Sequence, residues 1–183
     1  MAEPRNAFED LPGDLMMWIL IVSELLVFGA GLVAFLSVRI ADPNGFADAQ
    51  ATLHRTGAGV NTMILVTSGW LAAMAAVAAN AGSLARTRVL LGGAAALGAV
   101  FLIVKGIEYA DKAAHGITFE THAFFTFYFL LTGFHAAHVA AGIVLLGLVA
   151  VRCHPRTVEV GTAFWHMVDL VWVILFPILY LLG

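Results

Sequence analysis

The sequence predicts an all-α membrane protein, a bundle of five transmembrane helices, from three observations. Of the 183 residues, 61% are hydrophobic and only 11% are charged, whereas soluble domains carry about 25% charged residues. Five apolar runs are long enough to cross a bilayer, which takes about 20 helical residues. The runs also lack the alternating segments of roughly 10 residues that are typical of transmembrane β-barrels.

These runs leave no room for a second domain, so we expect one transmembrane domain over residues 1–183. The predicted spans lie at about 15–39, 60–81, 89–110, 123–151 and 160–182. Asp14 is the expected N-cap of the first helix. The connection at about 40–59 is long enough to hold a short helix at the membrane surface. Pro177 is expected to kink the last helix, because proline interrupts the helical hydrogen-bond ladder.

The basic residues between the spans predict an orientation, since cytoplasmic loops carry more Lys and Arg. With the N-terminus inside, the two short turns on the cytoplasmic side are basic and contain Arg86, Arg88, Arg152 and Arg156. An odd number of helices then places the C-terminus in the periplasm. The first 14 residues have no basic n-region, so we expect no cleaved signal peptide.

Charge and cysteine content exclude several classes of function. The net charge is −3 and no basic run occurs, which argues against a nucleic-acid partner. The single cysteine, Cys153, excludes an internal disulfide framework and any multi-cysteine metal site. We interpret it as an incidental thiol near a helix end.

Polar side chains within the predicted spans are the candidate functional residues, because each is costly in lipid. At about 1.5 Å per residue, Glu24 lies about 15 Å from the inner surface, and His166 and Asp169 lie about 9 and 14 Å from it. His135 and His138 descend from the outer side into the middle or inner half. We therefore predict one polar layer shared by three helices, in which carboxylates, imidazoles and indole N–H groups hydrogen-bond to one another.

Two further patterns concern helix packing. Gly133, Ala137 and Ala141 recur every four residues, and such a stripe of small residues lets a neighbouring helix approach closely. At the end of the third span, Lys105, Glu108, Asp111 and Lys112 alternate in sign at helical spacing and are expected to form ion pairs.

Three interpretations of the polar layer stay open on the residues alone. The groups can hydrogen-bond across helices and fix the packing. They can form a proton or ion path through Glu24, since intramembrane carboxylates often mark such routes. Finally, the histidines can bind a metal or a haem. For haem, two histidines must face each other at matched depth, and only His138 with His166 fits.

Five motifs in order resemble one protein family, subunit III of the haem-copper oxidases, which includes cytochrome c oxidase subunit III. The motifs are SELLVFGAGLVAF at 23–35, NTMILVTSGW at 61–70, EYADKAAHGIT at 108–118, TGFHAAHVAAG at 132–142 and WHMVDLVW at 165–172. Within that family, the chain resembles the short five-helix form. It looks most like the accessory protein of bacterial nitric oxide reductase clusters.

The resemblance implies a non-catalytic subunit or accessory factor in the bacterial inner membrane, acting in aerobic respiration or denitrification. Such a chain binds no haem or metal itself. It packs against a catalytic oxidase or nitric oxide reductase subunit that carries haem with copper or iron. It also holds phospholipid and supports proton uptake. Because the two N-terminal helices of the longer form are missing, the lipid cleft must be altered or completed by other chains.

The resemblance also implies roles for single residues. Glu24 matches the intramembrane glutamate of the family, and Glu108 matches its acidic residue after the third span. The family's FHxxH pair corresponds to His135 and His138, and its WHxVD motif to Trp165, His166 and Asp169.

Overall fold

The computed structural model describes residues 15–182, and every structural statement below refers to this range. The expected N-cap Asp14 lies outside it. The described chain is helical and contains no strand. Its elements are α1 (Leu15–Ala41), α2 (Pro43–Ala51), α3 (Arg55–Asn80), α4 (Leu84–Ala114), α5 (Ala123–Arg152), α6 (Pro155–Phe176) and the π-helical turn η1 (Pro177–Leu181). Five helices are long and apolar enough to cross a membrane, which confirms the predicted fold class.

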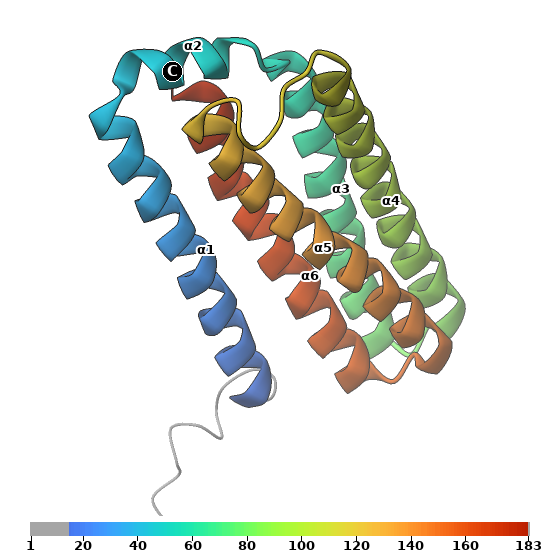
Figure 1. Ribbon diagram of the computed structural model, residues 1–183. Helices are drawn as coiled ribbons and strands as arrows, with labels where there is room; N and C mark the ends of the chain where they lie inside the picture. Colours follow the sequence, from blue (N-terminus) through green and yellow to red (C-terminus); the bar gives the residue numbers. More distant parts are fainter. Residues whose placement is uncertain (1–14, 183) are drawn as a thin grey trace, which may run out of the picture.

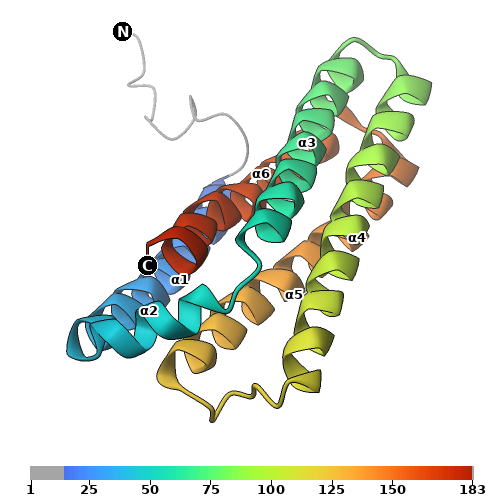
Figure 2. The same ribbon diagram turned by 90° about the horizontal axis from the view of Figure 1, so that it is seen from above.

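Helices α3 to α6 form a four-helix bundle in which each helix packs beside the next and α6 closes back onto α3. Helix α1 lies outside this bundle and packs against α5 and α6 (Figure 1, Figure 2). Helix α2 is the short surface helix predicted in the first connection, and it crosses the end of the bundle beside η1 (Figure 1). One outer side of α6 therefore lies between α1 and α3.

Close helix contacts in the bundle depend on glycines that face a tryptophan. A Cβ atom on Gly98 of α4 or on Gly142 of α5 would come within 2.6 Å of the Trp165 ring. These two glycines therefore admit the indole of α6 into the core, where it is fully buried. The predicted small-residue stripe does not have this role, because Ala137 and Ala141 are exposed.

The last turn is held by side chains from the other end of the sequence. The helix changes from α to π geometry at Pro177, the position where a kink is predicted. The final carbonyl groups of a helix have no partner within the helix. Here Gln50 of α2 donates to the carbonyl of Leu179 at 2.9 Å, and Arg39 of α1 donates to that of Leu182. These contacts cap the end of the bundle.

Candidate functional site

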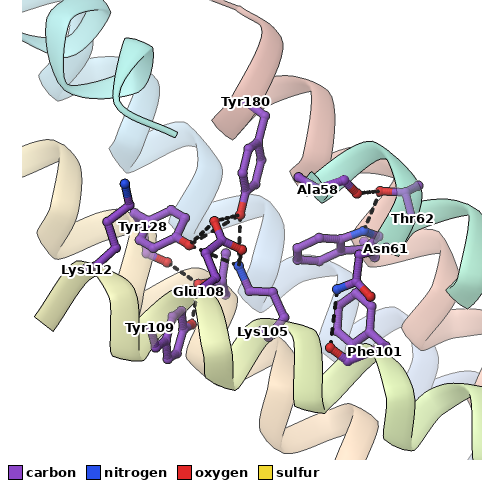
Figure 3. A network of polar contacts seen from close by, with 12 residues as sticks. Ala58, Asn61, Thr62, Phe101, Lys105, Glu108, Tyr109, Lys112, Tyr128 and Tyr180 are labelled. Carbon is purple, nitrogen blue, oxygen red and sulfur yellow. Dashed lines mark hydrogen bonds and ion pairs between the residues drawn. The ribbon is translucent and has the colours of Figure 1, made fainter. Parts of the chain in front are cut away.

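A buried polar cluster joins α4, α5 and η1 around the ion pair of Lys105 and Glu108 (Figure 3). The Lys105 ammonium donates to Glu108 Oε2 at 3.0 Å, to the Tyr128 hydroxyl at 3.0 Å and to the Tyr180 hydroxyl at 2.8 Å. Both tyrosines in turn donate to Glu108 Oε1, at 2.7 and 2.8 Å. All three ammonium protons thus have acceptors, and the predicted Lys105–Glu108 pair is confirmed.

Aromatic rings enclose this ion pair. The Lys105 ammonium lies 5.2 Å from the ring centre of Tyr109 and 5.4 Å from that of Trp172, distances at which a cation is attracted to an aromatic face. Lys112, two turns beyond Lys105 on α4, donates to the carbonyl of Thr52 at 2.7 Å, so it joins α4 to the end of α2. The charged groups and hydroxyls of the cluster bond to one another, so the cluster acts as a structural anchor that holds α4, α5 and η1 together.

Glu24 of α1 pairs with His138 of α5 inside the membrane-spanning region. His138 Nε2 lies 3.1 Å from Glu24 Oε2, and its Nδ1 lies 2.8 Å from the carbonyl of Phe134. A carbonyl oxygen only accepts, so Nδ1 carries a proton. The pair therefore brings a carboxyl group of α1 and an imidazole of α5 into direct contact.

His135 lies in a different environment from His138, although both rings contact Phe28. Its ring stacks on Trp172 at 5.0 Å and meets the edge of Phe101 at 5.7 Å. The side chain is fully buried, and neither ring nitrogen has a hydrogen-bond partner among the described residues. Its contacts are those of an aromatic core residue.

The residues of the WHxVD motif also lie in different environments. The indole of Trp165 donates to the Ser68 hydroxyl at 3.0 Å and is part of the core. His166 and Asp169 lie instead against Gly69 of α3: a Cβ atom there would be 3.1 Å from Asp169 Cγ and 3.7 Å from His166 Nδ1. The absence of a side chain at Gly69 therefore makes room for both polar groups.

The predicted contact between a carboxylate and an imidazole is present between Glu24 and His138, whereas His135 meets aromatic rings and Asp169 meets Gly69. The indoles of Trp165 and Trp172 donate hydrogen bonds, but to hydroxyls of α3 rather than to the acids. Within residues 15–182, no group of three or more His, Cys, Asp or Glu side chains is arranged to hold a metal ion.

Comparison with known proteins assigns the family. Residues 13–183 match the profile of the family described as cytochrome c oxidase subunit III. The chain belongs to this family. It is 34% identical to cytochrome c oxidase subunit 3 of Corynebacterium diphtheriae, over 88% of this chain and 84% of that protein. It is 32% identical to the Synechocystis protein of the same name, over 92% and 76% of the two chains.

A third relative, cytochrome c oxidase subunit 3 of Bacillus sp. strain PS3, is 27% identical and matches all of this chain and 92% of its own length. Membership in the subunit III family makes the chain a multi-pass membrane protein of the kind that serves haem-copper oxidases without a catalytic centre of its own. The resemblance stated from the motifs is confirmed at this level.

Sequence reasoning about this subunit III chain missed two members of the buried cluster. These are Tyr128 and Tyr180, neither of which is among the candidate residues that the sequence predicts. A signal was present, because a buried tyrosine hydroxyl usually has a hydrogen-bond partner. Lys105 and Glu108 were the polar groups in reach at that end of the bundle.

Proposed function

We propose that the chain is a non-catalytic subunit that stabilises the catalytic subunit of a respiratory haem-copper oxidase in the bacterial inner membrane. The observation that carries this proposal is the family match over residues 13–183. The redox chemistry, reduction of oxygen or of nitric oxide with electrons from cytochrome c or quinol, takes place at haem and copper or iron in partner chains. More specifically, we propose that the chain belongs to the branch that serves nitric oxide reductases.

Purification of the tagged chain from its native membranes in mild detergent tests this function. We expect a haem-containing catalytic subunit to co-purify, with oxygen or nitric oxide consumption that identifies the acceptor. The chain expressed alone should show no Soret band. A stoichiometric Soret band from the isolated chain would contradict the proposal and favour haem binding by His138 and His166.

We also propose that the Glu24–His138 pair supports proton uptake by the complex. The supporting observation is the 3.1 Å contact between His138 Nε2 and Glu24 Oε2, which joins α5 to α1. Replacing Glu24 with Ala should lower the turnover or the lifetime of the assembled complex without removing haem. Glu24→Gln is the matched variant, because it keeps a polar side chain of the same size next to His138 but has no carboxyl proton to exchange.

The outcomes of these two variants separate the alternatives. If Glu24→Gln behaves like Glu24→Ala, the titratable proton matters; if it behaves like the native chain, the pair acts through packing alone. Loss of haem from the partner in either variant would contradict the proposed role. Ion flux into proteoliposomes that hold only this chain, abolished by Glu24→Gln, would favour the ion-conducting alternative.

Bound phospholipid is the third part of the proposal, and the seam between α1 and α6 supports it. Two hollows of about 360 and 80 Å³ follow each other along this seam. Their lining is mostly apolar: Met17, Trp18, Ile21, Leu25, Phe28, Gly29 and Leu32 from α1, with Glu159, Ala163, His166, Met167, Leu170, Val171 and Ile174 from α6. At about 1.5 Å per residue, the α1 side runs for about 22 Å, which suits one acyl chain.

Filling the seam tests the lipid site. Gly29 lines the smaller hollow, and a Cβ atom there would meet nothing within 4 Å. Gly29→Leu should therefore reduce the phospholipid that remains bound after purification, as measured by native mass spectrometry. Gly147→Leu is the control, because Gly147 is also in open space but lies on α5 away from the seam. Equal lipid retention in both variants would contradict this site.

A further inference from the structure

The outer face formed by α3 and α6 combines apolar side chains with two polar ones. Val66 and Trp70 of α3 and Val173 of α6 are 44%, 62% and 45% exposed. His166 is exposed on the same side of α6, and Asp169 lies one turn further along, against Gly69. Residues three or four positions apart share a helix face. The exposed apolar side chains and the two polar residues therefore lie on the same outer side of α3 and α6.

The carboxyl group of Asp169 lacks a partner for one of its oxygens within residues 15–182. Asp169 is only 9% exposed, and its Oδ1 has no hydrogen-bond partner among the described residues. Both residues lie well inside the span Pro155–Leu181. A carboxyl group left unpaired at that depth is costly, and intramembrane polar residues almost always face other polar groups.

Two other intramembrane acids, Glu24 and Glu108, differ from Asp169 because each lies beside a basic side chain of this chain. Glu24 lies 3.1 Å from His138, and Glu108 accepts hydrogen bonds from Lys105, Tyr128 and Tyr180. Each of these acids is paired within the chain. Asp169 and the adjacent His166 therefore mark the place where a polar side chain from elsewhere is needed.

We propose that the outer face of α3 and α6 is the docking surface for a transmembrane helix of the partner subunit, which presents a hydrogen-bonding side chain to His166 and Asp169. His166 also lines the larger hollow of the α1–α6 seam, but the acyl chain proposed to lie there offers no hydrogen-bonding group to Asp169. Exposed large aromatics such as Trp70 are also characteristic of subunit interfaces. This inference rests on the proposed function, since it assumes a membrane-embedded catalytic partner.

Site-specific photocrosslinking in native membranes tests the surface with the full complex. A photoreactive residue is placed singly at Val66, Trp70 or Val173. Val144 and Leu148 of α5, each 63% exposed, carry it in the control chains. We expect crosslinks from the α3–α6 positions to a membrane-spanning segment of the catalytic subunit, mapped by mass spectrometry, and none from α5. Crosslinks from α5 alone, or from neither face, would overturn the proposal.

A substitution gives an independent measurement. His166→Leu removes the exposed polar group and should lower the amount of catalytic subunit retained during detergent washing by about five- to tenfold. His115→Leu is the control, because His115 is exposed at the C-cap of α4, away from this face. Native retention in His166→Leu would overturn the role of the polar group.

The two proposals fail in different ways. If haem co-purifies with the chain but the α3–α6 positions give no crosslink, the docking surface is wrong and the proposed function stands. If those positions crosslink to a membrane-spanning segment of an identified protein without haem, the surface stands and the proposed function is wrong.

Discussion

At the scale of single residues, Gly69 decides how closely α3 and α6 approach each other. The carboxyl group of Asp169 occupies the space that a side chain at Gly69 would need. Gly69→Ala should therefore push the two helices apart and lower the free energy of unfolding in detergent by about 1–3 kcal/mol. Thermal unfolding followed by circular dichroism measures this change.

Gly106→Ala on α4 provides the matched control for Gly69→Ala. A Cβ atom at Gly106 would meet nothing within 4 Å, and alanine is favoured over glycine inside helices. This variant should be as stable as the native chain or slightly more so. Equal destabilisation of both variants would show that the loss in Gly69→Ala does not come from a clash with Asp169.

Lys105 is the second residue whose replacement has a predictable effect. It is 3% exposed and supplies the cation for the Glu108 carboxylate. Breaking a buried ion pair by removing one partner typically costs about 3–5 kcal/mol, because the other charge stays buried and unpaired. Lys105→Met should therefore lower the free energy of unfolding by about that amount. The double variant Lys105→Met with Glu108→Gln should recover part of the loss.

A different result would revise the view of the cluster as an anchor. If the double variant is no more stable than Lys105→Met, the loss comes from packing against the surrounding rings rather than from the unpaired carboxylate. Chemical denaturation of all three chains in the same detergent gives the comparison.

At the scale of elements, two helix N-caps bond to each other. His122 accepts the backbone N–H of Phe124 on Nδ1 at 3.1 Å and so caps α5. Because Nδ1 accepts, Nε2 carries the proton and donates to Asp42 Oδ2 at 3.1 Å. Asp42 in turn accepts the N–H of Gly45 and caps α2. One relay thus positions α2 against the start of α5.

This relay makes the junction sensitive to acid. The hydrogen bond from His122, followed by that from Gly45, lowers the pKa of Asp42 below its usual 3.8. The carboxylate therefore contributes stability that is present above pH 3.8 and is lost as the pH falls through the lowered pKa. Asp42→Asn, which keeps a capping side chain without the charge, should melt at a lower temperature than the native chain at pH 7.

The same two chains should melt at nearly equal temperatures in strong acid, because the native carboxyl is then also neutral. Melting temperatures measured from pH 7 downward in one buffer series test this convergence. Asp48→Asn, an exposed change on the same helix, should leave the pH profile unchanged. A difference between Asp42→Asn and the native chain that is constant with pH would contradict the electrostatic explanation.

The elements also show what hydropathy can predict. The apolar run at about 89–110 lies inside a longer helix, Leu84–Ala114. Hydropathy marks the lipid-crossing part, whereas the helix continues into polar residues such as Lys112, whose ammonium reaches the carbonyl of Thr52. The existence and number of the spans could be predicted; their ends depend on contacts with other segments.

For the candidate site, the sequence could predict only how deep each residue lies in the membrane. Residue counting gives the depth of Glu24 and His138 and places them in one layer. It does not give the side of each helix that faces a neighbour, so it could not separate His135, which stacks on Trp172, from His138, which meets Glu24. That information comes from how α1 lies across α5 and α6.

At the scale of the whole molecule, the topology predicts what is accessible from each side of the membrane. The turns at 81–83 and 153–154 lie at one end of the bundle, and α2 and the connection at 115–122 lie at the other (Figure 1). The basic residues near the first end, among them Arg86 and Arg88, favour the cytoplasm. Single cysteines in a Cys153→Ser background can test this orientation.

Ser83→Cys and Glu120→Cys are suitable reporters, because both positions are exposed and lie at opposite ends of the bundle. A membrane-impermeant maleimide should label Glu120→Cys in cells whose outer membrane has been opened. It should label Ser83→Cys only after the inner membrane is permeabilised, since the first end is expected to face the cytoplasm. The reverse pattern would place the N-terminal end of α1 in the periplasm. Labelling of both positions in intact spheroplasts would contradict five complete crossings.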